Sequence, residues 1–418
     1  MRRIWSAIER IVPRLSLALV GLVVAFATDP AAVGLYSWGI LALTFFQSAT
    51  DQPIRQVAVS ALTTRGGRKF LRRYTVFAAA GGLVFMILAC SAASTLNSEM
   101  VWSAFGSLAP LCLTPIFTAI ATVPAARLQL AQRWSVITTG RTAAALAGTS
   151  AGVAVALMTS SIVGATLALL LSEAIFAAHT YLGARAVPPV SNPEMATGAV
   201  RAFLPMVCYS ILGWGQGQMD RVLVGAFSGT ASLGNLTVAS SVARSAGDAV
   251  AASQANVLRV DLNHTQGADS AVREIVARSL RSSYWLCAAT IIATIGATYF
   301  IVRPLLGASW ELALAIVPIL VLTTIPSAIS WSAAPVHVHR GTAKRAMIAP
   351  SVGIVFAPVV AYLSTSGLEL AAWAILAREM VLAITQVTLM GRAAPWGQVI
   401  PGFAATLALS AALLTLPT

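Results

Sequence analysis

One stretch decides the fold: RAFLPMVCYSILGWGQGQMDRVLVGAFSGTASLGNLTVASSVARSAGDAVAASQAN, residues Arg201–Asn256. It holds two apolar runs separated by a short turn of small residues, Ser228–Ser232. Each run is near the roughly 20 residues that a helix needs to cross a bilayer, so the stretch predicts a membrane hairpin. Its unusual residues mark where chemistry is expected: Gly213, Gly215 and Gly217 beside Gln216 and Gln218, then Asp220 and Arg221, then Arg244 and Asp248 one helical turn apart.

The composition extends this interpretation to the whole chain. Hydrophobic residues make up 57% of the 418 residues and charged residues 10%, with a mean hydropathy of +0.80. Soluble domains carry roughly 25% charged residues, so the chain is predicted to be an all-α polytopic membrane protein. The net charge is +13, and the basic residues lie in alternate loops, as expected for cytoplasmic loops of a membrane protein. The charge therefore reflects membrane topology, and no nucleic-acid partner is expected. The cysteines lie in apolar runs, which favours packing over disulfides or metal binding: Cys90, Cys112, Cys208 and Cys287.

The apolar runs predict about 13 transmembrane helices with a cytoplasmic amino terminus. The first 28 residues imitate a cleaved secretory signal, but a second apolar run follows at once, which favours a retained first helix. Basic loops are expected after each even-numbered helix, as at Arg65–Arg73 and Val257–Arg281. Besides the hairpin, the expected spans are Ile4–Thr28, Val33–Val57, Tyr74–Thr95, Ser103–Ala126, Ser135–Met158, Ser161–Tyr181, Ser282–Val302, Leu312–Val336, Met347–Leu363, Glu369–Met390 and Ile400–Leu416.

A Pro-rich polar link, Arg185–Arg201, divides the chain into two halves. Around it a weak repeat at an offset near 200 residues sets Asp29–Ile40 against Ser228–Ser240. Six helices per half predict two pseudo-symmetric bundles around a central cavity, as in secondary transporters. The expected limits are 1–186 for the first bundle, 187–200 for the link, 201–391 for the second bundle and 392–418 for an extra helix.

Several motifs suggest other chemistry but lack the context for it. The string GTSAG, Gly148–Gly152, matches a nucleophile elbow, yet it lies within an apolar helix, where small residues serve close packing. The rise per residue places Ser150 about 24 Å from the inner end of its helix and His179 near the inner end of another, so the two do not meet. His337 and His339 lack further metal ligands. We therefore expect no metal, and no cofactor is expected. No P-loop is present, so ATP is not expected to be the direct energy source.

Charged residues inside predicted spans are candidates for function. Arg14 is expected near mid-membrane with Arg10 one turn below it, although both also fit as snorkelling anchors. Arg378 and Glu379 are neighbours in the twelfth span and are expected to have separate partners. Asp220 is expected to form a structural cap or pair. Two pairs spaced i,i+4 lie near the inner boundary, Asp51 with Arg55 and Arg244 with Asp248.

Three segments resemble one family in the order in which they occur. DPAAVGLYSWGILALTFFQSATDQPIRQVAV, Asp29–Val59, resembles the first outer turn and second helix of the polysaccharide-transporter branch of the multidrug/oligosaccharidyl-lipid/polysaccharide (MOP) exporter superfamily. PAARLQLAQRWSVITTGRTAAALAG, Pro124–Gly148, resembles its passage from the fourth to the fifth helix. QMDRVLVGAFSGTASLGNLTVAS, Gln218–Ser240, resembles its turn from the seventh to the eighth helix. The chain departs from the family pattern at Gly234–Leu236, where Gly-Asn-Leu replaces Gly-x-Tyr, and in its thirteen spans.

The resemblance implies a flippase, not an enzyme, in the cytoplasmic (inner) membrane. Such proteins move a polyprenyl-pyrophosphate-linked oligosaccharide outward for exopolysaccharide, capsule or O-antigen assembly, with H⁺ or Na⁺ as coupling ions and a polymerase and glycosyltransferases as partners. Arginine binds a pyrophosphate bidentately and stays charged in an apolar setting. The substrate-binding candidates are Arg14, Arg55, Arg141, Arg244, Arg10 and Arg378; those for ion coupling or ion pairing are Asp51, Glu173 and Asp248; those for helix bending are Gly213, Gly215 and Gly217.

Three other functions stay open at the level of sequence. One is a non-transporting membrane scaffold, which full function with uncharged residues at positions 14 and 244 would favour. A drug or organic-cation antiporter of the same superfamily would line its cavity with carboxylates, whereas the first helix here has Arg10 and Arg14 and only Glu9 near its start. A membrane-embedded polysaccharide polymerase or glycosyltransferase would need a sizeable outer loop, and the predicted outer loops are short.

Overall fold

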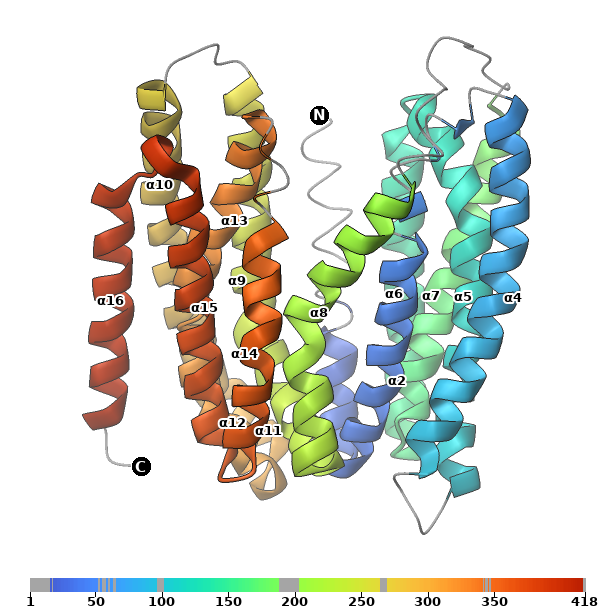
Figure 1. Ribbon diagram of the computed structural model, residues 1–418. Helices are drawn as coiled ribbons and strands as arrows, with labels where there is room; N and C mark the ends of the chain where they lie inside the picture. The colour runs from blue at the N-terminus through green and yellow to red at the C-terminus, as the bar shows by residue number, and fades with distance from the viewer. Residues whose placement is uncertain are drawn as a thin grey trace. The chain divides into compact units, whose positions relative to one another are not determined.

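The computed structural model describes residues 16, 18–51, 53–54, 58, 61–62, 65–95, 101–187, 203–263, 269–340, 342, 345 and 347–415. All regular structure in these residues is helical (Figure 1). The chain divides into two compact units, Met1–Trp214 and Gly215–Thr418. The division falls inside one helix, beyond the Pro-rich link that the sequence favours. Residues 188–202 of that link lie outside the described residues, and the predicted limits of the two bundles stay a prediction.

The first unit consists of long helices joined by short turns. Asp29 caps the first complete helix, because its side chain accepts a hydrogen bond of 2.8 Å from the Ala32 amide, and Pro30 fills the first helical position. The helices of this unit are α2 (Pro30–Ala49), α4 (Arg65–Thr95), α5 (Val101–Leu130), α6 (Trp134–Thr159), α7 (Val163–Arg185) and the first part of α8 (Phe203–Ser228).

The second unit begins within α8 and turns sharply. Gly229 alone separates α8 from α9, and its positive φ of 86° is a conformation that glycine adopts without strain. The helices that follow are α9 (Thr230–Asn263), α10 (Asp269–Ala297) continuing through a π-turn into α11 (Arg303–Leu306), α12 (Glu311–Val321), α13 (Thr324–His339), α14 (Ile348–Ser364), α15 (Leu368–Met390) and α16 (Trp396–Thr415).

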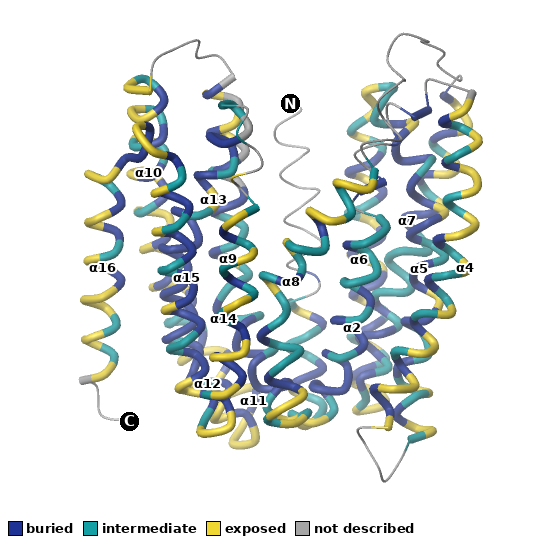
Figure 2. Tube along the Cα trace, viewed as in Figure 1, coloured by how far each residue is buried: buried dark blue, intermediate teal, exposed yellow. Residues whose placement is uncertain are grey.

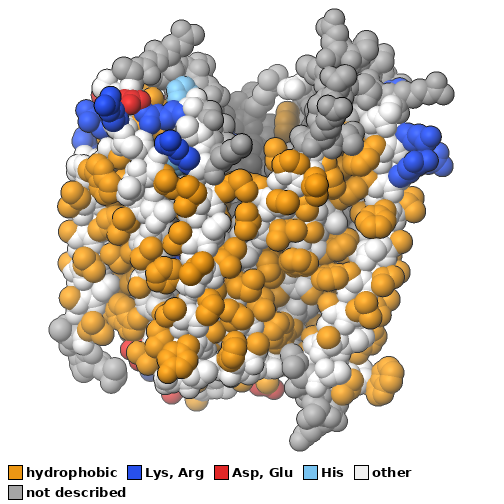
Figure 3. Space-filling model, in the orientation of Figure 1, with side chains coloured by type: hydrophobic (Ala, Val, Ile, Leu, Met, Phe, Trp, Pro, Cys, Tyr) orange, Lys and Arg blue, Asp and Glu red, His pale blue; other side chains and the backbone are white. Residues whose placement is uncertain are grey.

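The helices have the length and surface of membrane spans. Within the described residues, eight are long and apolar enough to cross a bilayer, or nine if α12 and α13, bent by 50°, form one span. Their outward faces are apolar: Trp102 and Phe300 are each 85% exposed. Hydrophobic side chains cover the middle of the helices, and exposed residues line the outer side of α16 (Figures 2 and 3). The chain is therefore a multi-pass membrane protein, as predicted.

The contact between α6 and α7 explains the GTSAG string. A Cβ on Gly152 would lie 2.6 Å from the carbonyl oxygen of Gly164, and one on Gly148 would lie 2.5 Å from that of Ala168. Only glycine lets the two backbones approach so closely, which confirms the packing role over a nucleophile elbow. His179 packs against Gly140, about three helical turns before Ser150, so the predicted separation of the serine and the histidine is also confirmed.

Three predicted boundaries are wrong. Arg65–Arg73 is the start of α4 and not a loop, and α9 and α10 extend through most of 257–281. Helices keep their hydrogen bonds internal, so good helix formers such as arginine and alanine prolong them into water, where hydropathy gives no signal. The tenth span is broken at Leu322 and Thr323 because Pro326, in the first turn of α13, has no N–H to donate to the preceding turn.

Candidate functional site

A charged network inside the second unit joins side chains of α8, α9 and α15. Arg378 is 1% exposed, and its two terminal nitrogens donate to different carboxylates. Nη1 lies 2.6 Å from Asp220 Oδ1, and Nη2 lies 2.8 Å from Glu379 Oε1. Both carboxylates are 4% exposed. These charge-assisted bonds balance the charge of the buried guanidinium and occupy both terminal nitrogens, while its buried Nε has no hydrogen-bond partner within the described residues.

This network corrects one prediction and accounts for a second. The sequence predicts separate partners for Arg378 and Glu379, and the structure gives Arg378 Asp220 of α8 and Glu379 Arg244 of α9. In addition, and against the prediction, the two side chains bond to each other at 2.8 Å. Asp220 pairs with Arg378, which agrees with its expected structural role.

Arg244 on α9 borders this network but is held more loosely. Its Nη2 lies 3.5 Å from Glu379 Oε1, and its side chain is 23% exposed. The expected i,i+4 ion pair with Asp248 does not form; Glu379 on α15 takes that place. Arg221 on α8 lies within electrostatic range of Arg244, and it donates to Gln218 Oε1 at 3.3 Å. Within the described residues, neither guanidinium therefore forms a carboxylate bond as short as the two of Arg378.

Arg141 and Glu173 form a separate ion pair in the first unit, between α6 and α7. Arg141 Nη1 lies 2.7 Å from Glu173 Oε1, and the side chains are 20% and 13% exposed. The guanidinium also lies over the ring of Phe176, 4.2 Å from its centroid. Glu173 Oε2 is buried and has no hydrogen-bond partner within the described part of the chain. The pair explains how α6 and α7 carry opposite charges at membrane depth.

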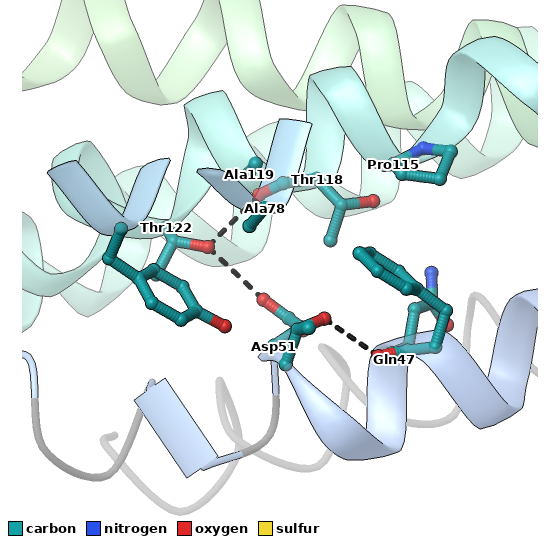
Figure 4. Close-up of a pocket in the computed structure, with 10 residues that line it drawn as sticks. Gln47, Asp51, Ala78, Pro115, Thr118, Ala119 and Thr122 are labelled. Atoms are coloured by element: carbon teal, nitrogen blue, oxygen red, sulfur yellow. Dashed lines mark hydrogen bonds between the residues drawn. The ribbon is translucent and has the colours of Figure 1, made fainter. Parts of the chain in front are cut away.

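Asp51 lies at the end of α2, beside a small cavity of about 10 Å³. Figure 4 shows its carboxylate directed at Thr122 of α5, whose hydroxyl donates to Asp51 Oδ1 at 3.1 Å. Further oxygen-bearing side chains line the cavity: Gln47, Thr50, Tyr74 and Thr118. The cavity has room for one water molecule or small ion. Hard cations prefer such a set of ligands, a carboxylate together with neutral oxygen atoms.

The glycines of α8 do not interrupt the helix, which is continuous from Phe203 to Ser228. Gly213 and Gly217 have no atoms within 4 Å of an added Cβ, whereas Gly215 faces Ile354 of α14 at 3.0 Å. Close packing therefore accounts for Gly215 alone, and a bending role for the three stays a prediction.

Some predicted site residues cannot be placed, and one was missed. Arg10, Arg14 and Arg55 lie outside the described residues. Asp248 on α9 lies near Arg244 and Arg221. The site prediction omitted Arg221, although it follows Asp220 directly. In the sequence, Arg221 follows Asp220 directly and would be taken for its ion-pair partner. Only the structure shows that Asp220 pairs with Arg378 instead.

Solved structures with the same architecture define the class. The chain is similar to the lipid II flippase MurJ in an inward-closed conformation, with a TM-score of 0.69 and 14% identity over 99% of this chain and 93% of that one. It is also similar to an outward-facing multidrug-resistance transporter of the MOP superfamily (TM-score 0.61, 15% identity, 98% and 95% covered). A third is a MOP-superfamily transporter from Pyrococcus furiosus (TM-score 0.59, 15% identity, 98% and 95% covered). The fold is that of the MOP superfamily.

The family is defined by sequence. A family profile described as "Polysaccharide biosynthesis protein" matches residues 69–315, more than half of the chain. The chain belongs to this polysaccharide biosynthesis family, which confirms the family resemblance of the three quoted segments. No curated protein matches the chain.

Proposed function

We propose that this protein is a flippase in the cytoplasmic membrane that moves a polyprenyl-pyrophosphate-linked oligosaccharide to the outer leaflet by alternating access. Glycosyltransferases that build the repeat unit supply its substrate, and a polymerase that joins repeat units consumes its product. Membership of a polysaccharide biosynthesis family and a fold shared with MOP-superfamily transporters support this proposal.

The observation that carries the proposal is that Arg221 and Arg244 are neighbours inside the helix bundle. Both lie on membrane helices, near each other and near the carboxylates of Asp220, Asp248 and Glu379. Within the described residues, neither forms an ion pair as short as those of Arg378, since Arg221 donates to Gln218 and Arg244 lies 3.5 Å from Glu379. A guanidinium held this loosely can donate bidentate hydrogen bonds to a pyrophosphate. In this proposal Arg221 and Arg244 bind the headgroup, and Arg378 links α15 to α8 through Asp220.

Ion coupling is assigned to Asp51. Of the other acidic residues that the sequence suggests, Glu173 already neutralises Arg141 at 2.7 Å, and Asp248 lies among arginines, where a cation is disfavoured. Asp51 lies with hydroxyl and amide oxygens around a cavity of about 10 Å³. Such oxygen ligands suit the binding of Na⁺ or of a proton.

The proposal is tested in proteoliposomes that contain a fluorescent polyprenyl-pyrophosphate oligosaccharide. An impermeant quencher reports the fraction of label on the outer surface over time. We expect Arg221→Gln with Arg244→Gln to slow appearance on the far side at least tenfold, since each charged hydrogen bond contributes about 1.5–3 kcal/mol. The control is Arg278→Gln, whose side chain is 75% exposed and pairs with Glu274. Equal rates in the double variant and the control would refute the assignment, and no movement by the unmodified protein under any ion gradient would refute the flippase.

A further inference from the structure

A second basic site lies in the first unit, apart from the charged residues discussed above. A cavity of about 560 Å³ is bounded by α4, α5 and α7. Four arginines line it: Arg68 and Arg72 of α4, Arg127 of α5 and Arg185 of α7. No aspartate or glutamate is among the lining residues that the structure describes. The cavity is partly open, and most of its remaining wall is aliphatic.

Within the part of the chain that the structure describes, the four arginines have no carboxylate partner. Arg185 instead lies 4.9 Å from the ring centroid of Tyr181. Arg68 and Arg72 are one helical turn apart on one face of α4, where like charges repel. Such a cluster is a site for an anion, since an anion removes the repulsion.

The depth of the cavity indicates the kind of anion. Arg127 and Arg185 lie in the last turns of α5 and α7, and Arg68 and Arg72 lie in the first turns of α4. All four therefore mark one end of the helices, which the positive-inside rule places at the cytoplasmic surface. Figure 3 shows basic side chains of this unit beyond a band of hydrophobic ones.

Below the arginines the wall faces lipid. Val76, Ile120 and Tyr181 line the cavity and are 66%, 40% and 50% exposed. Phosphate groups at the level of the arginines would thus have acyl chains along an apolar wall. Among the described residues of the lining, Thr75 and Tyr181 are the polar side chains besides the arginines, too few to bind the hydroxyl groups of an oligosaccharide.

We propose that this cavity is a binding site for an anionic phospholipid of the cytoplasmic leaflet. Arg68, Arg72, Arg127 and Arg185 hold the phosphate, and Val76 and Ile120 receive the acyl chains. Basic cavities between transmembrane helices on the cytoplasmic side recognise anionic headgroups in this way. The site does not depend on the proposed transport function, because it is formed within α4, α5 and α7.

The test is native mass spectrometry of the purified full-length protein titrated with phosphatidylglycerol or phosphatidylcholine. We expect phosphatidylglycerol to bind and Arg72→Gln with Arg127→Gln to weaken it about thirtyfold, from about 1 kcal/mol for each basic residue near the membrane surface. The matched control is Arg73→Gln with Arg133→Gln, which removes the same charge from nearby residues that do not line the cavity. The control is expected to weaken binding by less than about threefold.

Three outcomes would overturn the proposal. Equal losses in the two double variants would show a general surface charge and not a site. Equal binding of phosphatidylcholine would remove the role of the anionic headgroup. Preference for polyprenyl pyrophosphate over phosphatidylglycerol would make the cavity part of the substrate path. If the double variant does not fold, the exposed single variant Arg72→Gln gives the same discrimination, and Arg127→Lys, which keeps the charge and loses the planar fork, is expected to bind at an intermediate strength.

Discussion

The two units place arginines among membrane helices in different ways. In the first unit Arg141 has one carboxylate, Glu173, at 2.7 Å, and both side chains keep some exposure, 20% and 13%. In the second unit Arg378 is 1% exposed and bonds to two carboxylates, Asp220 and Glu379. An arginine inside a membrane protein is therefore not an anion site by virtue of its depth. What decides is how many of its donors other side chains already occupy.

The largest effect is expected at Arg378. Arg378→Gln leaves Asp220 and Glu379 buried beside each other without their shared cation, which typically costs about 3–5 kcal/mol. Thermal unfolding of the purified protein measures this loss, with the exposed Arg278→Gln as a control within about 0.5 kcal/mol. Adding Asp220→Asn and Glu379→Gln to Arg378→Gln is expected to recover most of the loss. No recovery would mean that packing, and not charge, holds α8 against α15.

A smaller loss is expected for the pair in the first unit. Glu173→Gln removes one charged hydrogen bond from a partly exposed site, and we expect a destabilisation of about 1–3 kcal/mol. The double variant Arg141→Gln with Glu173→Gln is expected to lose less than the sum of the single variants, since the two side chains contact each other. Unfolding of all four proteins gives this cycle. Additive losses would show that Arg141 is held mainly by Phe176.

Arg244 should separate stability from transport. Its single contact with Glu379 is long, 3.5 Å, so Arg244→Gln is expected to change the free energy of unfolding by only about 1 kcal/mol. The flipping rate of the Arg244→Gln variant in the proteoliposome assay is nonetheless expected to fall at least tenfold, because a side chain that binds the headgroup is lost. If Arg244→Gln were as destabilised as Arg378→Gln and flipped its substrate at the unchanged rate, Arg244 would have a structural role and would not bind the headgroup.

The smallest effect on stability is expected at Asp51. Asn has the shape of Asp and still accepts the hydrogen bond from Thr122, so Asp51→Asn should change the free energy of unfolding by less than about 1 kcal/mol. The readout is transport driven by a Na⁺ or a proton gradient, and the response to one of these gradients should disappear. A variant that still responds to both would move the coupling role to Asp248 or Glu173.

Sequence reasoning found most of the helices and could not find their ends. Hydropathy reveals a helix only where it lies within the bilayer. The part of α4 from Arg65 to Tyr74 and the solvent-exposed ends of α9 and α10 are therefore predicted as loops. The break between α12 and α13 carried a signal, since Pro326 cannot donate a backbone hydrogen bond, but the apolar run around it concealed the break. Gly148 and Gly152 were read correctly because close helix packing needs small residues at regular spacing.

The sequence by itself determined that this is an all-helical, multi-pass membrane protein, where its spans lie and which family it resembles. These properties depend on length, hydropathy and order along the chain, which need no knowledge of neighbours. Only the tertiary structure decided which carboxylate meets which arginine: Arg378 with Asp220, 158 positions away, and Arg141 with Glu173. It also brought Arg68, Arg72, Arg127 and Arg185 around one cavity. Charge interactions act over a few ångströms in space, and helix packing, not spacing in sequence, sets those distances.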